Sequence, residues 1–158
     1  MPEVKIKRAE RMGKRPNMPF RATEGAAGSD LEAFLPEGSI TLAHGDRKAV
    51  PTGLFAELPE GYCAFIMARS GLSLKKGLRL TNGVGLIDSD YRGEIMVSLR
   101  NDSDQDVVIE DGMRIAQMVI MQVPQVTFAE CGILGETKRG ENGFGSTGID
   151  KKKEEIVL

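Results

Sequence analysis

Glycine and proline interrupt this sequence so often that long helices are excluded. The 158 residues include 19 Gly and 7 Pro, about one in every six positions. Inside the body of the chain, only the windows 94–111 and 113–123 reach helix length without one, and the polar stretch 101–106 breaks the first. Because Gly costs about 1 kcal/mol and Pro about 3 kcal/mol in a helix interior, coiled coils, helical bundles and helical solenoids are poor interpretations.

Short runs with strand character fill the first 123 residues instead. Alternation of apolar and polar residues predicts a half-buried strand, and a short apolar run between turns predicts a buried one. Such runs occupy 4–7, 30–35, 39–42, 49–58, 62–67, 94–99, 106–109 and 113–123. Many short strands separated by turns are typical of an all-β sandwich or barrel.

Two local signals refine this pattern. The dipeptide Asn82-Gly83 lies between the strand candidates 78–81 and 84–87, and it is the strongest hairpin signal in the chain. Residues 70–76 predict one helical turn, with Ser70 as N-cap and Gly77 just beyond the C-terminus.

The character of the chain changes at about residue 132. Residues 132–148 hold six Gly in seventeen positions, and Phe144 is their one aromatic residue. Such a composition does not build a hydrophobic core. We therefore expect one β domain over 1–131, followed over 132–158 by a flexible Gly-rich arm and a charged tail.

Charge and cysteine content exclude several classes of protein. The formal net charge is −2, which disfavours nucleic acid as a partner. No apolar stretch approaches the roughly 20 residues that span a bilayer, and the first residues lack the apolar region of a signal peptide. Cys63 and Cys131 are expected to be reduced thiols. These features predict a cytoplasmic protein with no membrane or nucleic-acid partner.

The inventory of catalytic side chains is also narrow. The chain has a single His, His44, in a segment that resembles a turn, and it has no Trp. His-rich zinc sites are therefore excluded, and a Ser-His-Asp triad would have to use His44. If the protein is an enzyme, its base is expected to be a carboxylate.

Individual motifs remain ambiguous when they are read one at a time. Residues 143–148 match G-x-G-x-x-G, but only ten residues follow, so the helix and second strand of a dinucleotide fold cannot be built. The segment is either a phosphate-binding loop or a disordered tail. Arg69-Ser70-Gly71 is either an anion site at a helix start or a plain cap. Asp88 and Asp90 are carboxylates of the kind that usually cap turns.

Five motifs in order carry a more specific signal than any one of them. They occupy 26–31, 69–72, 82–93, 114–117 and 139–148. In this order and at this spacing they resemble the five motifs of the trimeric dUTP pyrophosphatases (dUTPases), and the resemblance spans roughly residues 22–148. Two departures are Ala68, where the family usually has Pro, and Asn142, where Gly is common.

The resemblance implies a fold and a reaction. The expected subunit is an all-β, distorted jelly roll (β-clip type) with a flexible C-terminal arm, in a homotrimer whose three subunits share each active site. The expected reaction is Mg²⁺-dependent hydrolysis of dUTP to dUMP and pyrophosphate. It would limit uracil in DNA and supply dUMP for dTMP synthesis.

The resemblance also implies a role for each motif residue. Asp88 would activate the water that attacks the α-phosphorus, and Asp30 would reach Mg²⁺ through water. The nucleoside would contact Asn82, Gly85, Leu86, Ile87, Tyr91, Met96 and Phe144. The phosphates would contact Arg69, Ser70, Gly71, Gln117, Arg139, Gly145, Ser146 and Thr147. Arg92 and Arg114 are expected to be structural.

Two alternatives share this scaffold. A dCTP deaminase, or a bifunctional dCTP deaminase and dUTPase, would place a catalytic Glu in the strand after Gly93, where this chain aligns Ser98. A non-catalytic trimeric binding or regulatory module would not need the whole motif set, which this chain retains.

Overall fold

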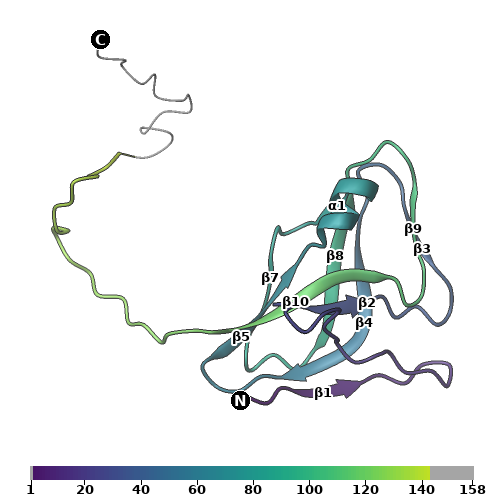
Figure 1. The fold of residues 1–158 in the computed structure, drawn as a ribbon. Helices are drawn as coiled ribbons and strands as arrows, with labels where there is room; N and C mark the ends of the chain where they lie inside the picture. Colours follow the sequence, from purple (N-terminus) through teal and green to yellow (C-terminus); the bar gives the residue numbers. More distant parts are fainter. Residues whose placement is uncertain (1, 143–158) are drawn as a thin grey trace, which may run out of the picture. The chain divides into compact units, whose positions relative to one another are not determined.

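The computed structural model describes residues 2–142. Within them the chain forms ten strands and one short helix (Figure 1). In chain order these are β1 (Lys5–Arg8), β2 (Ser29–Glu32), β3 (Ile40–Leu42), β4 (Arg47–Glu57), β5 (Tyr62–Met67), α1 (Ser70–Lys76), β6 (Leu78–Leu80), β7 (Gly85–Ile87), β8 (Glu94–Asn101), β9 (Val107–Ile109) and β10 (Arg114–Gln122). This order confirms the strands expected from the sequence.

The strands form two antiparallel sheets of four strands each. One sheet has the order β1-β4-β8-β6 and the other has the order β2-β10-β5-β7, while β3 and β9 pair separately. Neighbours in each sheet are distant in sequence: β10, for example, lies between β2 and β5 (Figure 1). The sequence period of two therefore predicts the strands, whereas the partners of each strand depend on the whole fold.

The hydrophobic core lies between the two large sheets. Leu54 on β4 and Ile95 on β8 belong to the same buried cluster as Leu31 on β2, Ile66 on β5 and Ala116 on β10. Each of these side chains is at most 2% exposed. Along β8 the residues alternate between this core and the opposite face of the sheet, as expected for a strand that is buried on one side.

The cap of helix α1 lies one residue earlier than the sequence suggested. The cap position belongs to Arg69, and no side chain caps the first turn, so the expectation that Ser70 is the N-cap is wrong. Ser70 is the first helical residue because Arg69 has extended backbone angles. At the other end Gly77 adopts φ 63° and ends the helix, as expected.

The hairpin expected at Asn82-Gly83 does not form. Strand β6 pairs with β8, and β7 pairs with β5, so the strands on either side of this turn belong to different sheets. The Val84 amide donates to the Asn82 carbonyl at 2.8 Å, which makes a tight turn. Gly83 adopts φ 73° whereas Asn82 does not have a positive φ, so the turn differs from the hairpin turn that Asn-Gly favours.

The chain divides into two units, Met1–Gln125 and Val126–Leu158. Residues 126–142 of the second unit have no helix or strand, and their side chains are exposed. The expected boundary at residue 131 and the expected flexible arm stay predictions, and residues 143–158 lie outside the described part of the chain. Among residues 2–142, no helix is long and apolar enough to cross a membrane.

Candidate active site

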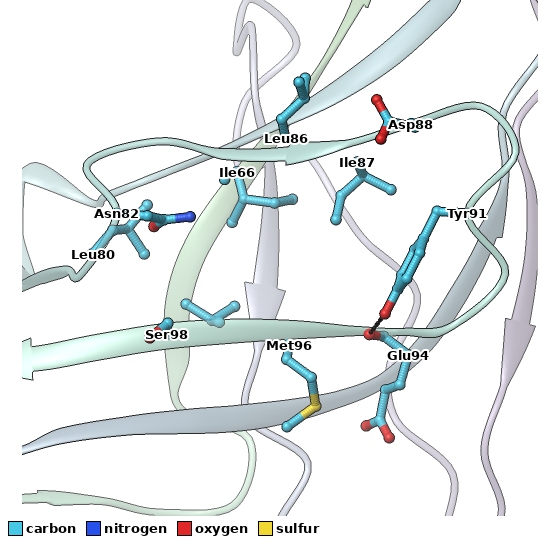
Figure 2. Close-up of a pocket in the computed structure, with 12 residues that line it drawn as sticks. Ile66, Leu80, Asn82, Leu86, Ile87, Asp88, Tyr91, Glu94, Met96 and Ser98 are labelled. Atoms are coloured by element: carbon cyan, nitrogen blue, oxygen red, sulfur yellow. Dashed lines mark hydrogen bonds between the residues drawn. The ribbon is translucent and has the colours of Figure 1, made fainter.

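A cavity of about 260 Å³ opens between β7 and β8 (Figure 2). Its lining comes from the turn after β6, from β7 and the loop that follows it, and from the first half of β8. The lining residues are Ile66, Leu80, Asn82, Gly85, Leu86, Ile87, Asp88, Tyr91, Glu94, Met96, Val97 and Ser98. Six of the site residues expected from the middle motif, including Asp88, therefore lie in one cavity, together with the expected Met96.

Strand β8 provides the floor of the cavity. Glu94, Met96 and Ser98 lie two residues apart, so the pleat places them on one face of the strand. The side chain of Met96 lies on this face, and the residue is 42% exposed. The Ser98 hydroxyl donates to the Thr81 hydroxyl at 3.1 Å, so β6 and β8 are linked at the deep end of the cavity.

Strand β7 forms the opposite wall. Ile87 points toward β8, whereas Leu86 and Asp88 point away from it (Figure 2). The alternation follows from the strand pleat. Among residues 2–142, strand β7 is the last strand of its sheet and pairs only with β5, so within this part of the chain one row of its main-chain N–H and C=O groups has no partner strand. Such a row can bind the polar edge of a planar ring.

The loop after β7 holds Tyr91 across the end of the cavity. The Tyr91 hydroxyl donates to the Glu94 carbonyl at 3.1 Å (Figure 2). The Tyr91 amide donates to the Asp88 carbonyl at 3.2 Å. A Cβ atom at Gly93 would lie 2.2 Å from the Tyr91 hydroxyl oxygen, so only a glycine at position 93 lets the ring pack there. Arg92 donates to the Ser89 and Tyr91 carbonyls at 2.7 Å and 3.0 Å, and the structural role expected for it stays a prediction.

A second polar cluster joins β2, β10 and the residues after β5. Asp30 is 8% exposed; it forms an ion pair with Arg69 Nε at 3.0 Å and accepts a hydrogen bond from Arg114 Nη1 at 3.2 Å. The Gln117 side chain donates to the Ala68 carbonyl at 3.0 Å. The Asp30 carboxylate is held between two guanidinium groups, and the structural role expected for Arg114 stays a prediction.

The predicted phosphate residues do not line the cavity between β7 and β8. Arg69 and Gln117 belong to the second cluster, and Ser70 and Gly71 are exposed in the first turn of α1. Arg139 lies in the second unit, where its Nε donates to the Asn142 carbonyl at 2.8 Å. Phe144, Gly145, Ser146 and Thr147 lie outside the described residues. Among residues 2–142, six residues of the predicted nucleoside set line the cavity, whereas Arg69, Ser70, Gly71 and Gln117 of the predicted phosphate set do not.

Several lining residues were not anticipated. Glu94 and Ser98 could have been found from the sequence, because the period of two in β8 places them on the same face as Met96. Ile66 and Leu80 come from β5 and β6. No local pattern identifies these two residues, because their position depends on how the two sheets pack.

The residues present were also considered as metal ligands. Within residues 2–142, no group of three or more His, Cys, Asp or Glu side chains is arranged to hold a metal ion. Asp30 is the carboxylate expected to reach Mg²⁺ through water, and each of its two oxygens forms an ion pair with an arginine. This donor set suits an ion that arrives on a ligand with its own oxygen atoms rather than one held in a protein cage.

Comparisons with known proteins agree with this geometry. The dUTPase family model matches residues 14–148. The chain is 51% identical over 148 residues to the deoxyuridine 5′-triphosphate nucleotidohydrolase of Rickettsia prowazekii (strain Madrid E), an alignment that covers 93% of this chain and 97% of the relative.

Solved structures give the same result for the fold. The Staphylococcus bacteriophage 80alpha dUTPase with dUPNHPP matches with a TM-score of 0.82 and 25% identity, over 93% of this chain and 99% of that one. An Asp-to-Asn variant of the dUTPase from phage phi11 of S. aureus, which coordinates a structural Mg(II) ion, matches with a TM-score of 0.72 and 20% identity, over 83% of this chain and 97% of that one. These matches confirm the expected all-β jelly roll.

Proposed function

The chain belongs to the dUTPase family, and from this membership and the cavity we infer that it hydrolyses dUTP to dUMP and pyrophosphate. It is a dUTP diphosphatase. The observation that carries the assignment of roles is the cavity between β7 and β8, which brings together Asn82, Tyr91 and Asp88. We match Asn82 with the base, Tyr91 with the sugar and Asp88 with the reacting phosphate of the substrate.

We propose that the uracil ring lies against the open edge of β7. The main-chain groups of Leu86 and Ile87 and the carboxamide of Asn82 offer both donors and acceptors, as the polar edge of a pyrimidine requires. Gly85 leaves room beside them, and Met96 closes the floor. Because the recognising groups are mostly backbone, their positions depend on the pairing of β7 with β5 rather than on side-chain rotamers.

Tyr91 is proposed to lie under the deoxyribose. The residue is held at two points. The side-chain hydroxyl donates a hydrogen bond to the Glu94 carbonyl, and the main-chain amide donates one to the Asp88 carbonyl. A ring fixed in this way leaves no room for a 2′-hydroxyl group. Rejection of ribonucleotides then depends on the position of this one side chain.

Asp88 is the proposed general base. Its carboxylate takes a proton from a water molecule, the water oxygen bonds to the α-phosphorus, and the bond to the pyrophosphate leaving group breaks. Asp88 is exposed in the single chain, so exclusion of water by further protein is expected to raise its basicity.

That further protein is proposed to be a second and third copy of the chain. Arg69, Ser70, Gly71 and Gln117 do not line the cavity of their own chain, so a neighbouring copy is the proposed source of these phosphate contacts. The arm residues Phe144, Gly145, Ser146 and Thr147, with Arg139, are proposed to close over a neighbour's site. The working unit is then a homotrimer with shared active sites.

Mg²⁺ is the proposed cofactor, bound mainly by the triphosphate. When bound, it neutralises phosphate charge that would otherwise repel the attacking oxygen. Asp30 is its proposed contact, through water. Two thiols without disulfide partners, Cys63 and Cys131, agree with the proposed cytoplasmic location.

The direct test is incubation with dUTP, dCTP, dTTP and UTP, with measurement of pyrophosphate and ammonia. We expect pyrophosphate from dUTP and no ammonia from dCTP, because the carboxylate that a deaminase needs is replaced by Ser98, whose hydroxyl binds Thr81. Absence of pyrophosphate from dUTP, or equal turnover of UTP, would contradict the assignment.

The role of Asp88 has its own test. Asp88→Asn keeps the size of the side chain and removes the base, so turnover is expected to fall by about 10²–10⁴-fold while dUMP binding is kept. Asp90→Asn is the matched control, because Asp90 is an exposed carboxylate in the same loop. Equal loss in both variants, or activity retained by Asp88→Asn, would remove Asp88 as the base.

A further inference from the structure

Glu94 lines the cavity, but its carboxylate points away from β7, and both carboxylate oxygens accept hydrogen bonds there (Figure 2). Its side chain is 16% exposed. Oε1 accepts from the Gly53 amide at 2.7 Å, and Oε2 accepts from Arg11 Nη2 at 2.5 Å. The main-chain carbonyl of the same residue accepts the Tyr91 hydroxyl. Glu94 therefore connects the N-terminal segment to the ring that faces the sugar.

The Gly53 anchor exists because the β4–β8 ladder is irregular at this point. The register shifts between Pro51 and Phe55, and Gly53 adopts φ 66° between them. A Cβ atom there would lie 2.5 Å from the Phe34 ring. The shift frees the Gly53 amide for Glu94, and the Gly53 carbonyl accepts from the Ala9 amide at 2.7 Å.

The Arg11 anchor is held by a tight turn. Arg11 and Lys14 exchange two main-chain hydrogen bonds, at 3.0 Å and 2.9 Å, and the two residues between them both have positive φ. The Arg11 guanidinium also lies 5.6 Å from the centre of the Phe34 ring. Arg11 is thus fixed by its backbone and by an aromatic contact before it reaches Glu94, so the ion pair loses little additional side-chain entropy.

We propose that the Arg11–Glu94 pair is a positioning device that holds Tyr91 in place for discrimination between deoxyribose and ribose. The proposal rests on the proposed function, because it deepens the role of Tyr91. Arg11 and Glu94 hold the start of β8, and the Glu94 carbonyl holds the Tyr91 hydroxyl. Loss of the pair lets the start of β8 shift, and the ring then gains freedom toward the position of a 2′-hydroxyl group.

The test uses Arg11→Gln, Glu94→Gln and the double variant, with Arg15→Gln as the matched control. Arg15 lies in the same segment, and its ion pair with Glu10 at 2.7 Å is exposed on both sides. Glu94→Gln keeps an oxygen for the Gly53 amide and removes the charge that Arg11 binds. Folding of each variant is checked by thermal unfolding.

The first measurement is the ratio of kcat/KM for dUTP to kcat/KM for UTP. We expect this ratio to fall by about tenfold in Arg11→Gln and in Glu94→Gln. The double variant is expected to match the single variants, because both substitutions break the same pair. Arg15→Gln keeps the wild-type ratio. A ratio unchanged in Arg11→Gln, or additive losses in the double variant, would overturn the proposal.

The second measurement does not depend on turnover. The chain has two tyrosines, so in a Tyr62→Phe background with selectively labelled tyrosine the ring signals in an NMR spectrum belong to Tyr91. We expect Arg11→Gln to shift these signals and Arg15→Gln to leave them unchanged. Unshifted signals would overturn the proposal. Shifted signals in a protein that does not hydrolyse dUTP would support the positioning and contradict the proposed function alone.

Discussion

The substitution Gly93→Ala tests the position of Tyr91 with a single added methyl group. Gly93 does not have a positive φ, so alanine causes no backbone strain. The new Cβ atom would lie 2.2 Å from the Tyr91 hydroxyl oxygen and 2.5 Å from Cζ, whereas ordinary contact begins at 3.4 Å. The ring therefore has to retreat by about 1.2 Å at its hydroxyl end.

This displacement predicts different costs for stability and for catalysis. The hydrogen bond to the Glu94 carbonyl, 3.1 Å long, is lost, and a typical net value for such a bond is about 1 kcal/mol. At about 2–4 °C per kcal/mol for a chain of this size, the melting temperature falls by only a few degrees. A reacting group displaced by about 1 Å can cost about 100-fold in rate, so kcat/KM for dUTP is expected to fall by about that factor.

The assay combines pyrophosphate release with thermal unfolding at fixed protein concentration. Gly25→Ala is the control, because a Cβ atom there meets nothing within 4 Å and φ is not positive. Tyr91→Phe removes the atom nearest to the new methyl group, so adding it to Gly93→Ala is expected to restore part of the lost stability. Wild-type kcat/KM in Gly93→Ala would refute the reasoning, because Tyr91 would then not be held where the substrate needs it.

Three further changes test other parts of the molecule. Truncation after Thr137 is expected to leave a folded β core, because the side chains of residues 126–142 are exposed. Pyrophosphate release is expected to fall by at least about tenfold, because the shortened chain excludes water less well from the site. Unfolding of the truncated chain would show that the arm is structural. Thr52→Val removes the buried hydroxyl that donates to the Ile95 carbonyl at 2.6 Å, and denaturant unfolding should show a loss of about 1–3 kcal/mol, with exposed Thr41→Val as the control. The hydrogen bond from Arg79, with a second from Arg100, lowers the pKa of Asp102 from 3.8. The stability that this pairing contributes is complete above pH 3.8 and is lost as pH falls through the folded pKa. The free energy of unfolding of Asp102→Asn should therefore be lower than that of the wild type near neutral pH, and the two values should converge in acid. A constant difference across this pH range would contradict a stabilising role for the Asp102 ion pairs.

Local patterns were sufficient to predict most of the secondary structure. The run from Tyr62 to Met67 is observed as β5 with the expected bounds, and the apolar stretch from Met113 is β10, as its β-branched residues suggested. Gly77 ends α1 as expected, because a left-handed residue favours glycine. The N-cap was wrong by one residue, since Arg69 takes the extended cap geometry without a side-chain cap. Helix ends are decided by backbone angles that several residue types can adopt.

Strand pairing was the feature that the sequence predicted least well. Asn82-Gly83 predicted a hairpin, and the turn forms, but β6 and β7 join different sheets. This separation opens the cavity between β7 and β8, because a hairpin there would have filled the space with its own ladder. A turn sequence determines the direction of the chain over four residues, whereas pairing is determined by how much apolar surface each strand buries in its sheet.

Strand period and glycine content were enough to predict the all-β class, and motif order and spacing were enough to predict most residues that line the cavity between β7 and β8. These features are properties of neighbouring positions in the chain. The tertiary structure was needed to show that Asp30 lies between Arg69 and Arg114 and that Arg69, Ser70, Gly71 and Gln117 lie outside the cavity between β7 and β8. It was also needed to show that Arg11 reaches Glu94 across 83 positions of the chain. These contacts form when the two sheets pack around one core. A local sequence pattern does not show which distant segment will pack against it.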